Sequence, residues 1–553
     1  MTAYNRKLST QLCVALWVFM FSRRLFLFLI SLCLAIPILS ILGAWLQWDA
    51  LSFQILNEMS QTVLPDYVLT SLILCVLVAF GVISMGCISA LAVTLFDFPG
   101  RKFLEWALLL PLAMPAYVVA YAYTDFFQYS GPLQQWIRLS TNIDGAVLPD
   151  IRNVWGAAFV LSVCLYPYVY LLTRTALSER AVHLMEAARL LGADLWRRIF
   201  SLALPLARPA ITAGTSLALM ETLADFGVSN YFGVQTFTAG IYKAWLVMDN
   251  RIAASELAGF LLLFVFIVLT MEQRAQSRIR FGNANLSSPN TETQPLPLDF
   301  AQGIFCFFVC ALPVFLGFVL PVVIMLQSFV SNGFSNHVPW SRFFHWTFHS
   351  LRLGVITALI AVAIALFLAF AQRLAPHRYT KWAIQISSLG YAVPGVVIVV
   401  GLLLPVAWLQ NIWPQSQIGF LLTATIAGLI WAYLVRFVAV SLQSIQSGYA
   451  RIPTTLDDSS SMLGVSGLRL ITRVHVPLLS RSLSAAVLLV LVDVMKELPA
   501  TLMLRPFNTD TLAVMAYQFA RDERLGEASL PSLALVVAGL LPVILLSRSL
   551  RHK

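Results

Sequence analysis

Acidic side chains occur inside two stretches of this chain that are otherwise apolar. They form two pairs with a spacing of four residues: Glu221, Asp225, Asp493 and Glu497. At that spacing, two side chains of an α-helix share one face. An ionisable group within a membrane span costs about 2.5–3.5 kcal/mol, so it usually faces a cavity or a partner. The pairs therefore predict either a charged pathway or a gate in which Lys496 and Arg505 neutralise the acids.

A second pattern occurs twice, at an offset of 272 positions. Each copy has an acid, two small residues, a glycine and a proline: Glu186, Ala187, Ala188, Gly192 and Pro205, then Asp458, Ser459, Ser460, Gly464 and Pro477. The acid suits the N-terminus of a short helix, and the glycine can take the left-handed conformation that ends it. The proline begins the next span, where its missing N–H costs nothing. Two equivalent loops predict two partner subunits.

The elements that position these residues are membrane helices. The chain has 59% apolar and 11% charged residues and a mean hydropathy of +0.80, whereas about 25% of residues are charged in a soluble domain. A bilayer core about 30 Å thick needs about 20 apolar residues per crossing. Twelve stretches satisfy this requirement, near 25–46, 68–96, 104–127, 155–177, 206–232, 252–271, 302–328, 350–372, 382–409, 416–444, 478–505 and 530–548.

The distribution of Lys and Arg among the loops predicts that both termini are cytoplasmic. The net charge of +10 is explained by this topology, so it does not indicate a nucleic-acid surface. Residues 1–24 lack a small-residue cleavage site and are predicted to be a cytoplasmic lead-in.

Two parallel six-span modules follow from the repeat, with one pathway between them. A Ser-, Asn- and Pro-rich segment between the modules cannot bury enough apolar surface to order itself. The predicted organisation is 1–67, cytoplasmic N-terminus, first span and periplasmic loop; 68–271, first module; 272–301, cytoplasmic linker; 302–349, seventh span and periplasmic loop; 350–548, second module; and 549–553, cytoplasmic tail.

The repeated loop resembles the EAA loop of permease subunits in binding-protein-dependent ABC importers, over about 68–271 and 350–548. In that family the loop forms a coupling helix that sits in a cleft of the ATPase subunit. The resemblance implies an all-α type I importer fold, whose two halves, fused here, alternate access as two ATPase copies close and open. Asp458, Ser459 and Ser460 replace Glu-Ala-Ala in the second copy, which predicts unequal coupling by the two loops.

The segments from Met220 to Gly227 and from Asp493 to Thr501 resemble those of fused ferric-iron permeases. This resemblance implies that the substrate is ferric iron, delivered by a periplasmic binding protein across the bacterial inner membrane. Carboxylate oxygens suit the path of such a hard cation. The alternatives are an importer of the same class for thiamine, sulfate or polyamine, and a secondary transporter. The paired loops argue against the secondary transporter, which needs its own ion-coupling site.

The sequence contains no G-x4-G-K-[S/T] phosphate loop. We therefore expect no enzymatic activity and no cofactor in this chain, with ATP bound by the partner ATPase. His337, His345 and His349 fall in one predicted periplasmic loop, but no Cys or paired acid completes a metal site there.

Overall fold

The computed structural model describes residues 25–45, 50–142, 145–178, 185, 188–280, 295–333, 340–374 and 377–551. These residues are mostly helical, and the described strands are one short parallel pair, β1 (Phe96–Asp97) with β2 (Leu296–Pro297). Ten helices in the described ranges are long and apolar enough to span a membrane, or up to twelve if each of two bent pairs counts as one span. The predicted all-α membrane fold is confirmed.

The chain divides into two compact units. Unit 1 comprises Met1–Leu46 and Leu351–Val494, and unit 2 comprises Gln47–Ser350 and Met495–Lys553. Two of the three boundaries fall within α16 (Trp340–Leu374) and α24 (Ser480–Lys496), and the third lies between Leu46 and Gln47. These units follow spatial contacts, so they do not test the module boundaries predicted from the sequence.

Unit 2 contains most of the first half of the chain and its last helices. Its elements are α2 (Ala50–Gln61), α3 (Leu64–Leu95), β1, α4 (Arg101–Ala107), η1 (Leu110–Ala113), α5 (Ala116–Phe127), α6 (Pro132–Thr141), α7 (Val154–Ala176), α9 (Leu195–Arg198), η3 (Ile199–Ala203), α10 (Leu204–Ala224), α11 (Gly227–Tyr231), α12 (Phe237–Tyr242), η4 (Lys243–Val247), α13 (Arg251–Arg280), β2, α14 (Phe300–Val314), η5 (Phe315–Val319), α15 (Leu320–Gly333), α25 (Pro499–Leu504), α26 (Leu512–Arg521) and α27 (Leu525–Arg551).

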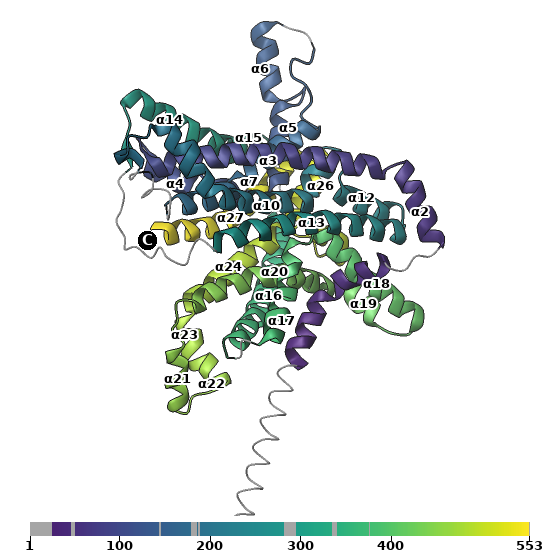
Figure 1. Ribbon diagram of the computed structural model, residues 1–553. Helices are drawn as coiled ribbons and strands as arrows, with labels where there is room; N and C mark the ends of the chain where they lie inside the picture. The colour runs from purple at the N-terminus through teal and green to yellow at the C-terminus, as the bar shows by residue number, and fades with distance from the viewer. Residues whose placement is uncertain are drawn as a thin grey trace, which may run out of the picture. The chain divides into compact units, whose positions relative to one another are not determined.

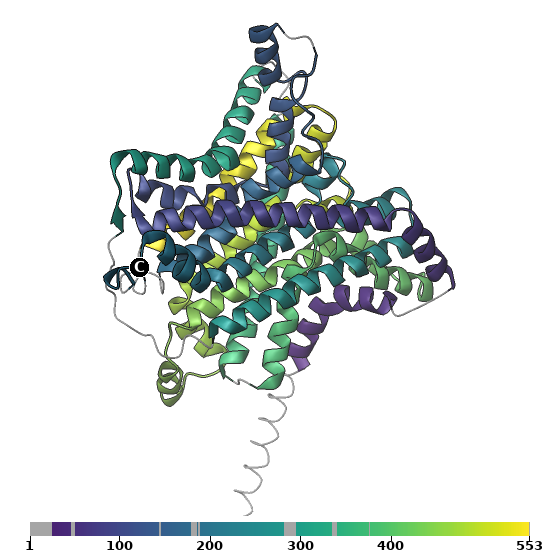
Figure 2. The same ribbon diagram turned by 45° about the horizontal axis from the view of Figure 1, so that its top comes forward.

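Helices α3, α7 and α10 pack side by side in the core of unit 2 (Figure 1 and Figure 2). Glycines allow this close approach. A Cβ placed on Gly86 of α3 would lie 2.7 Å from the Cβ of Val169 in α7, and one on Gly214 of α10 would lie 2.7 Å from the Cα of Val169. Small residues at helix contacts are typical of membrane proteins, because packing drives their association.

Unit 1 contains the helix Leu25–Trp45 and most of the second half of the chain. Its other elements are α17 (Arg378–Leu389), η6 (Gly390–Ala392), α18 (Gly395–Ile412), α19 (Ile418–Thr423), α20 (Ile426–Tyr449), α21 (Thr455–Met462), α22 (Leu468–Leu470), η7 (Ile471–His475) and α23 (Val476–Leu478). Helices α17 and α18 pack against α20.

Two predicted spans, 104–127 and 382–409, are interrupted in the same way. In each, a short 3₁₀ turn is followed by an extended residue and a proline, Met114-Pro115 in unit 2 and Val393-Pro394 in unit 1. Proline cannot donate to the preceding turn, so the helix breaks. At the first break the chain bends by 91°, and the Leu112 carbonyl accepts a hydrogen bond from Lys496 Nζ at 3.0 Å. The sequence predicts both stretches as continuous spans, whereas the structure breaks each of them before a proline.

Candidate functional site

The first repeated loop ends its helical turn at Gly192, as predicted. Gly192 has a φ of 81°, and the N–H of Ala193 donates to the Ala188 carbonyl at 3.0 Å. This bond is part of the Schellman motif that closes many helices. A Cβ placed on Gly192 would meet nothing within 4 Å, so the left-handed backbone, not lack of space, favours glycine here. Glu186 and Ala187 lie outside the described residues.

The second loop repeats this geometry 272 positions later. Helix α21 ends before Gly464, which has a φ of 77°. The N–H of Val465 donates to the Ser460 carbonyl at 2.9 Å, matching the bond between Ala193 and Ala188. The two loops therefore share the turn that ends the helix at Gly192 and Gly464.

Each loop is followed by a five-residue π turn in the same register, η3 in the first half and η7 in the second. Such turns are rare and occur frequently at functional sites. Pro205 and Pro477 follow these turns. Pro205 stands in the first turn of α10 (Leu204–Ala224), as predicted, although the helical stretch that could span a membrane begins earlier, at Leu195. In the second copy, Pro477 lies in the short helix α23 (Val476–Leu478), and the chain bends by 81° between this helix and α24.

Large apolar side chains are exposed at both loop tips. Leu190 and Leu191 are 89% and 88% exposed, and Met462 and Leu463, at the same offset of 272, are 90% and 83% exposed. Contiguous exposed apolar surface marks interaction sites in folded proteins. The loops thus present matched apolar tips immediately before their left-handed glycines.

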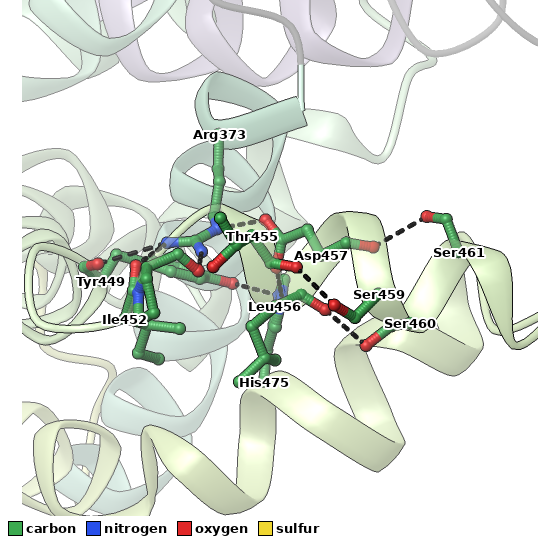
Figure 3. Close-up of polar contacts among 11 residues, drawn as sticks. Arg373, Tyr449, Ile452, Thr455, Leu456, Asp457, Ser459, Ser460, Ser461 and His475 are labelled. Carbon is green, nitrogen blue, oxygen red and sulfur yellow. Dashed lines mark hydrogen bonds and ion pairs between the residues drawn. The ribbon is translucent and has the colours of Figure 1, made fainter.

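The serines that replace alanine in the second loop are bonded within α21 itself (Figure 3). Ser459 Oγ donates to the Thr455 carbonyl and Ser460 Oγ to the Leu456 carbonyl, each at 2.8 Å. Such bonds to the preceding turn satisfy the hydroxyls locally. Asp458 is exposed in the first turn of α21. The departure from Glu-Ala-Ala therefore leaves the geometry of the short helix intact.

A buried charged cluster holds the second loop, and the sequence analysis missed it. Arg373 Nε donates to Asp457 Oδ2 at 2.5 Å, and His475 Nε2 bonds Asp457 Oδ1 at 2.9 Å. The Tyr449 hydroxyl bonds His475 Nδ1 at 3.0 Å (Figure 3). Burial opposes ionisation of Asp457, but hydrogen bonds and charge from Arg373 and His475 hold the pKa of its carboxyl below the usual value. Asp457 therefore stays ionised.

Arg373 also binds the end of α20. Its Nη1 donates to the carbonyls of Tyr449 at 3.2 Å and Ile452 at 3.0 Å, and its Nη2 donates to the Pro453 carbonyl at 2.9 Å. Carbonyls at a helix C-terminus have no partner within the helix and attract cations. Arg373 therefore joins the end of α16 to α20 and α21. Because 84 residues separate Arg373 from Asp457, no local spacing in the sequence indicated their contact.

Asp225 caps the short helix α11. Its carboxylate accepts hydrogen bonds from the N–H of Val228 at 3.4 Å and from the N–H and hydroxyl of Ser229 at 3.0 and 3.1 Å. These N–H groups belong to a first helical turn and have no partner within it. The carboxylate supplies that partner.

Glu497 caps α25 in the same way. Its carboxylate accepts from the N–H groups of Ala500 and Thr501, both at 3.1 Å. Helix α10 ends at Ala224 and α24 ends at Lys496, one residue before each capping acid. The prediction that each acidic pair shares one helix face is therefore wrong. Asp225 and Glu497 each lie just after the end of a helix, and each carboxylate binds the N–H groups of the next helix.

The other predicted pathway residues have separate environments. Glu221 lies within α10 and Asp493 within α24, both half-buried. Arg505 forms an ion pair with Asp510, an acid that the sequence analysis did not single out. Arg505 and Asp510 are close in the sequence, so a search for neighbouring opposite charges could have found this ion pair.

No cluster of three or more His, Cys, Asp or Glu side chains suited to a metal ion occurs among the described residues. His345 and His349 lie in α16 rather than in the predicted loop, and His337 lies outside the described residues.

Comparison with known proteins identifies the class of the chain. Residues 83–281 match the family model described as "Binding-protein-dependent transport system inner membrane component". The chain is 23% identical to the Fe(3+)-transport system permease protein FbpB 2 of Haemophilus influenzae, over 86% of this chain and 88% of that protein. It is 22% identical to the probable ABC transporter permease protein y4fN of Sinorhizobium fredii, over 84% of each chain.

A shorter match joins part of the chain to the molybdenum transport system permease protein ModB of Escherichia coli. It has 37% identity and covers 24% of this chain and 57% of ModB. The many apolar helices and the family match together indicate a multi-pass inner-membrane transporter subunit with the type I ABC importer fold. Over residues 83–281, the chain is thus similar to the binding-protein-dependent transport system inner membrane components.

Proposed function

We propose that this chain forms the translocation pathway of an ABC importer and binds two ATPase copies, one through each repeated loop. The matched backbone of the loops around Gly192 and Gly464 carries this proposal. The exposed apolar tips support it, because an apolar surface of this kind is stabilised when a partner covers it. Because the two tips occupy equivalent positions of the repeat, they suit two copies of the same partner.

The orientation proposed here places both termini and both loops in the cytoplasm, as the distribution of Lys and Arg indicates. A periplasmic binding protein delivers the substrate on the opposite side. ATP binds to the partner ATPase, and this chain binds no cofactor of its own.

The proposed substrate is ferric iron. Support comes from the similarity to FbpB 2, which extends over 86% of this chain. The molybdenum permease ModB of E. coli and the sulfate transport system permease CysT of E. coli are also similar, but over 24% and 35% of this chain. Molybdate and sulfate are therefore the alternative substrates. Acidic residues in the membrane, such as Glu221 and Asp493, suit a cation better than these anions.

Assembly is tested by native mass spectrometry of the detergent-solubilised complex, expressed together with its ATPase partner. We expect a ratio of one permease chain to two ATPase chains. A stable complex with one ATPase, or no complex, would contradict the two-loop proposal.

Substrate choice is tested in proteoliposomes that contain the full complex and its binding protein. Uptake of radioactive ferric iron is compared with uptake of radioactive molybdate and sulfate. We expect iron uptake that requires ATP and persists when an ionophore removes the proton gradient. Uptake of an anion instead would reject iron, and uptake without ATP would reject the importer class in favour of a secondary transporter.

A further inference from the structure

The charged cluster of Arg373, Asp457 and His475 distinguishes the second loop from the first. Arg373 and His475 have side chains that are 8% and 0% exposed, and the Asp457 side chain is 12% exposed. The cluster joins four elements. Arg373 lies in the last turn of α16, and Tyr449 is the last residue of α20. Asp457 lies in α21 and His475 in η7. Figure 3 shows Arg373 and His475 bonded to the Asp457 carboxylate and Tyr449 bonded to His475.

Three of the four equivalent positions in the first half are apolar. At the offset of 272, Arg373 corresponds to Arg101, whose Nε donates to the Val93 carbonyl at 2.7 Å. Tyr449, Asp457 and His475 correspond to Leu177, Met185 and Ala203. All three are buried. Apolar contacts are non-directional, whereas a hydrogen bond weakens steeply when its angle departs from linear. The second loop therefore has a defined orientation relative to α16, α20 and η7 that apolar contacts do not impose on the first.

We infer that Arg373, Asp457 and His475 are positioning residues for the second ATPase contact. They hold α21 as one rigid body with the ends of α16 and α20 and with η7, which runs into α23 before the chain bends by 81° ahead of α24. Movement of the ATPase bound to α21 is then transmitted to these helices without loss in a flexible loop. The inference rests on the proposed function, because it assigns a role to the cluster within the coupling of ATP hydrolysis to transport.

The Ser459 and Ser460 bonds agree with this role. Both serine hydroxyls bond carbonyls within α21, whereas Asp457 bonds Arg373 of another helix. His475 Nε2 carries a proton, because a carboxylate can only accept a hydrogen bond. The Asp457 carboxylate thus accepts hydrogen bonds from two side chains in different elements, Arg373 in α16 and His475 in η7.

The test compares Asp457→Asn, which removes the charge at nearly constant size, with Asp457→Glu, which retains it. Hydrogen–deuterium exchange of residues 455–465 reports local opening. We expect Asp457→Asn to accelerate exchange there by about tenfold or more, as for loss of charge-assisted hydrogen bonds, and to leave residues 188–193 unchanged. Asp457→Glu restores part of the protection.

Coupling is measured in the same preparations as ATP hydrolysed per ferric ion taken up in proteoliposomes with the complete complex. We expect this ratio to rise severalfold in Asp457→Asn, with two ATPases still bound. Glu527→Gln is the control, because it removes an exposed ion pair with Arg524 outside both loops. If the cluster only stabilised the fold, Asp457→Asn would lower the melting temperature without changing the number of ATP molecules hydrolysed per ferric ion.

If Asp457→Asn does not accumulate in the membrane, His475→Gln replaces it. A glutamine amide cannot bond both Asp457 and Tyr449 in the geometry of the imidazole ring, so the ratio should again rise. Loosened exchange with an unchanged ratio in either variant would overturn the positioning role alone. Failure of the unaltered chain to bind ATPase would instead overturn the proposed function, and this inference with it.

Discussion

Asp225 and Glu497 accept backbone hydrogen bonds from the residues three and four positions after them. Their partners are Val228 and Ser229 in the first half and Ala500 and Thr501 in the second. Both acids stand at the same offset of 272, between a long helix and a short one. Each carboxylate thus stabilises a helix break inside a predicted membrane span, and any role in transport has to be separated from this capping.

Amide substitutions separate capping from charge. Asp225→Asn and Glu497→Gln keep a carbonyl oxygen that accepts from the N–H groups, but they remove the charge that offsets dehydration of a cation. We expect ferric iron uptake in proteoliposomes to fall while ATP hydrolysis stimulated by the binding protein persists, with little change in melting temperature. Asp225→Ala, the control for capping, should also lower stability by about 0.5–2 kcal/mol. Normal uptake in both amide variants would leave these residues with a capping role only.

The loop glycines allow a direct comparison of the two loops. Neither Gly192 nor Gly464 has an atom within 4 Å of a built Cβ, so valine introduces backbone strain without a clash. A left-handed conformation costs a residue with a side chain about 1–2 kcal/mol. We expect Gly192→Val to reduce transport more than Gly464→Val, because the charged cluster holds α21 against this strain. Transport is measured at matched membrane levels.

Asparagine is the matched control at both glycines, since it tolerates the left-handed region better than other residues with side chains. Gly192→Asn and Gly464→Asn should retain most transport. Equal loss of transport in the two valine variants would show that the loops contribute alike.

Acid should loosen the second loop selectively. The pKa of Asp457 is lowered in the folded protein, so ionised Asp457 stabilises α21 fully above its unfolded pKa of about 4. That stabilisation is lost as the pH falls through the lower folded value. Pulsed hydrogen exchange, corrected for its intrinsic pH dependence, should show residues 455–465 losing protection at acid pH before residues 188–193. Asp457→Asn should abolish this pH dependence, and identical profiles in the unaltered chain and the variant would contradict the assignment.

Close helix packing predicts the effect of adding one methyl group. In Gly214→Ala the new Cβ would lie 2.7 Å from the Val169 Cα and 2.9 Å from the Tyr168 carbonyl oxygen, so α7 and α10 must separate. We expect a loss of about 1–3 kcal/mol, as for overpacked cores, seen as a lower melting temperature in detergent. Gly43→Ala is the control, because nothing lies within 4 Å of its built Cβ. Equal melting temperatures for the two variants would reject the packing explanation.

The sequence by itself determined the membrane fold and the repeated loops. The apolar spans follow from composition and length, since each crossing needs a continuous apolar run. The left-handed turns at Gly192 and Gly464 follow from residue type and register, because glycine ends a helix through interactions within a few residues. Patterns that depend on neighbours along the chain can be read directly from the sequence.

Tertiary structure decided where the charged side chains bind. The acids at 225 and 497 were interpreted as members of helical pairs, but each caps the next helix, since the proline and glycine residues around them allow the backbone to break there. Arg373, Asp457 and His475 meet only because α16, α21 and η7 pack together. An ion pair between distant residues depends on distance and burial in three dimensions, and neither quantity is encoded by spacing along the chain.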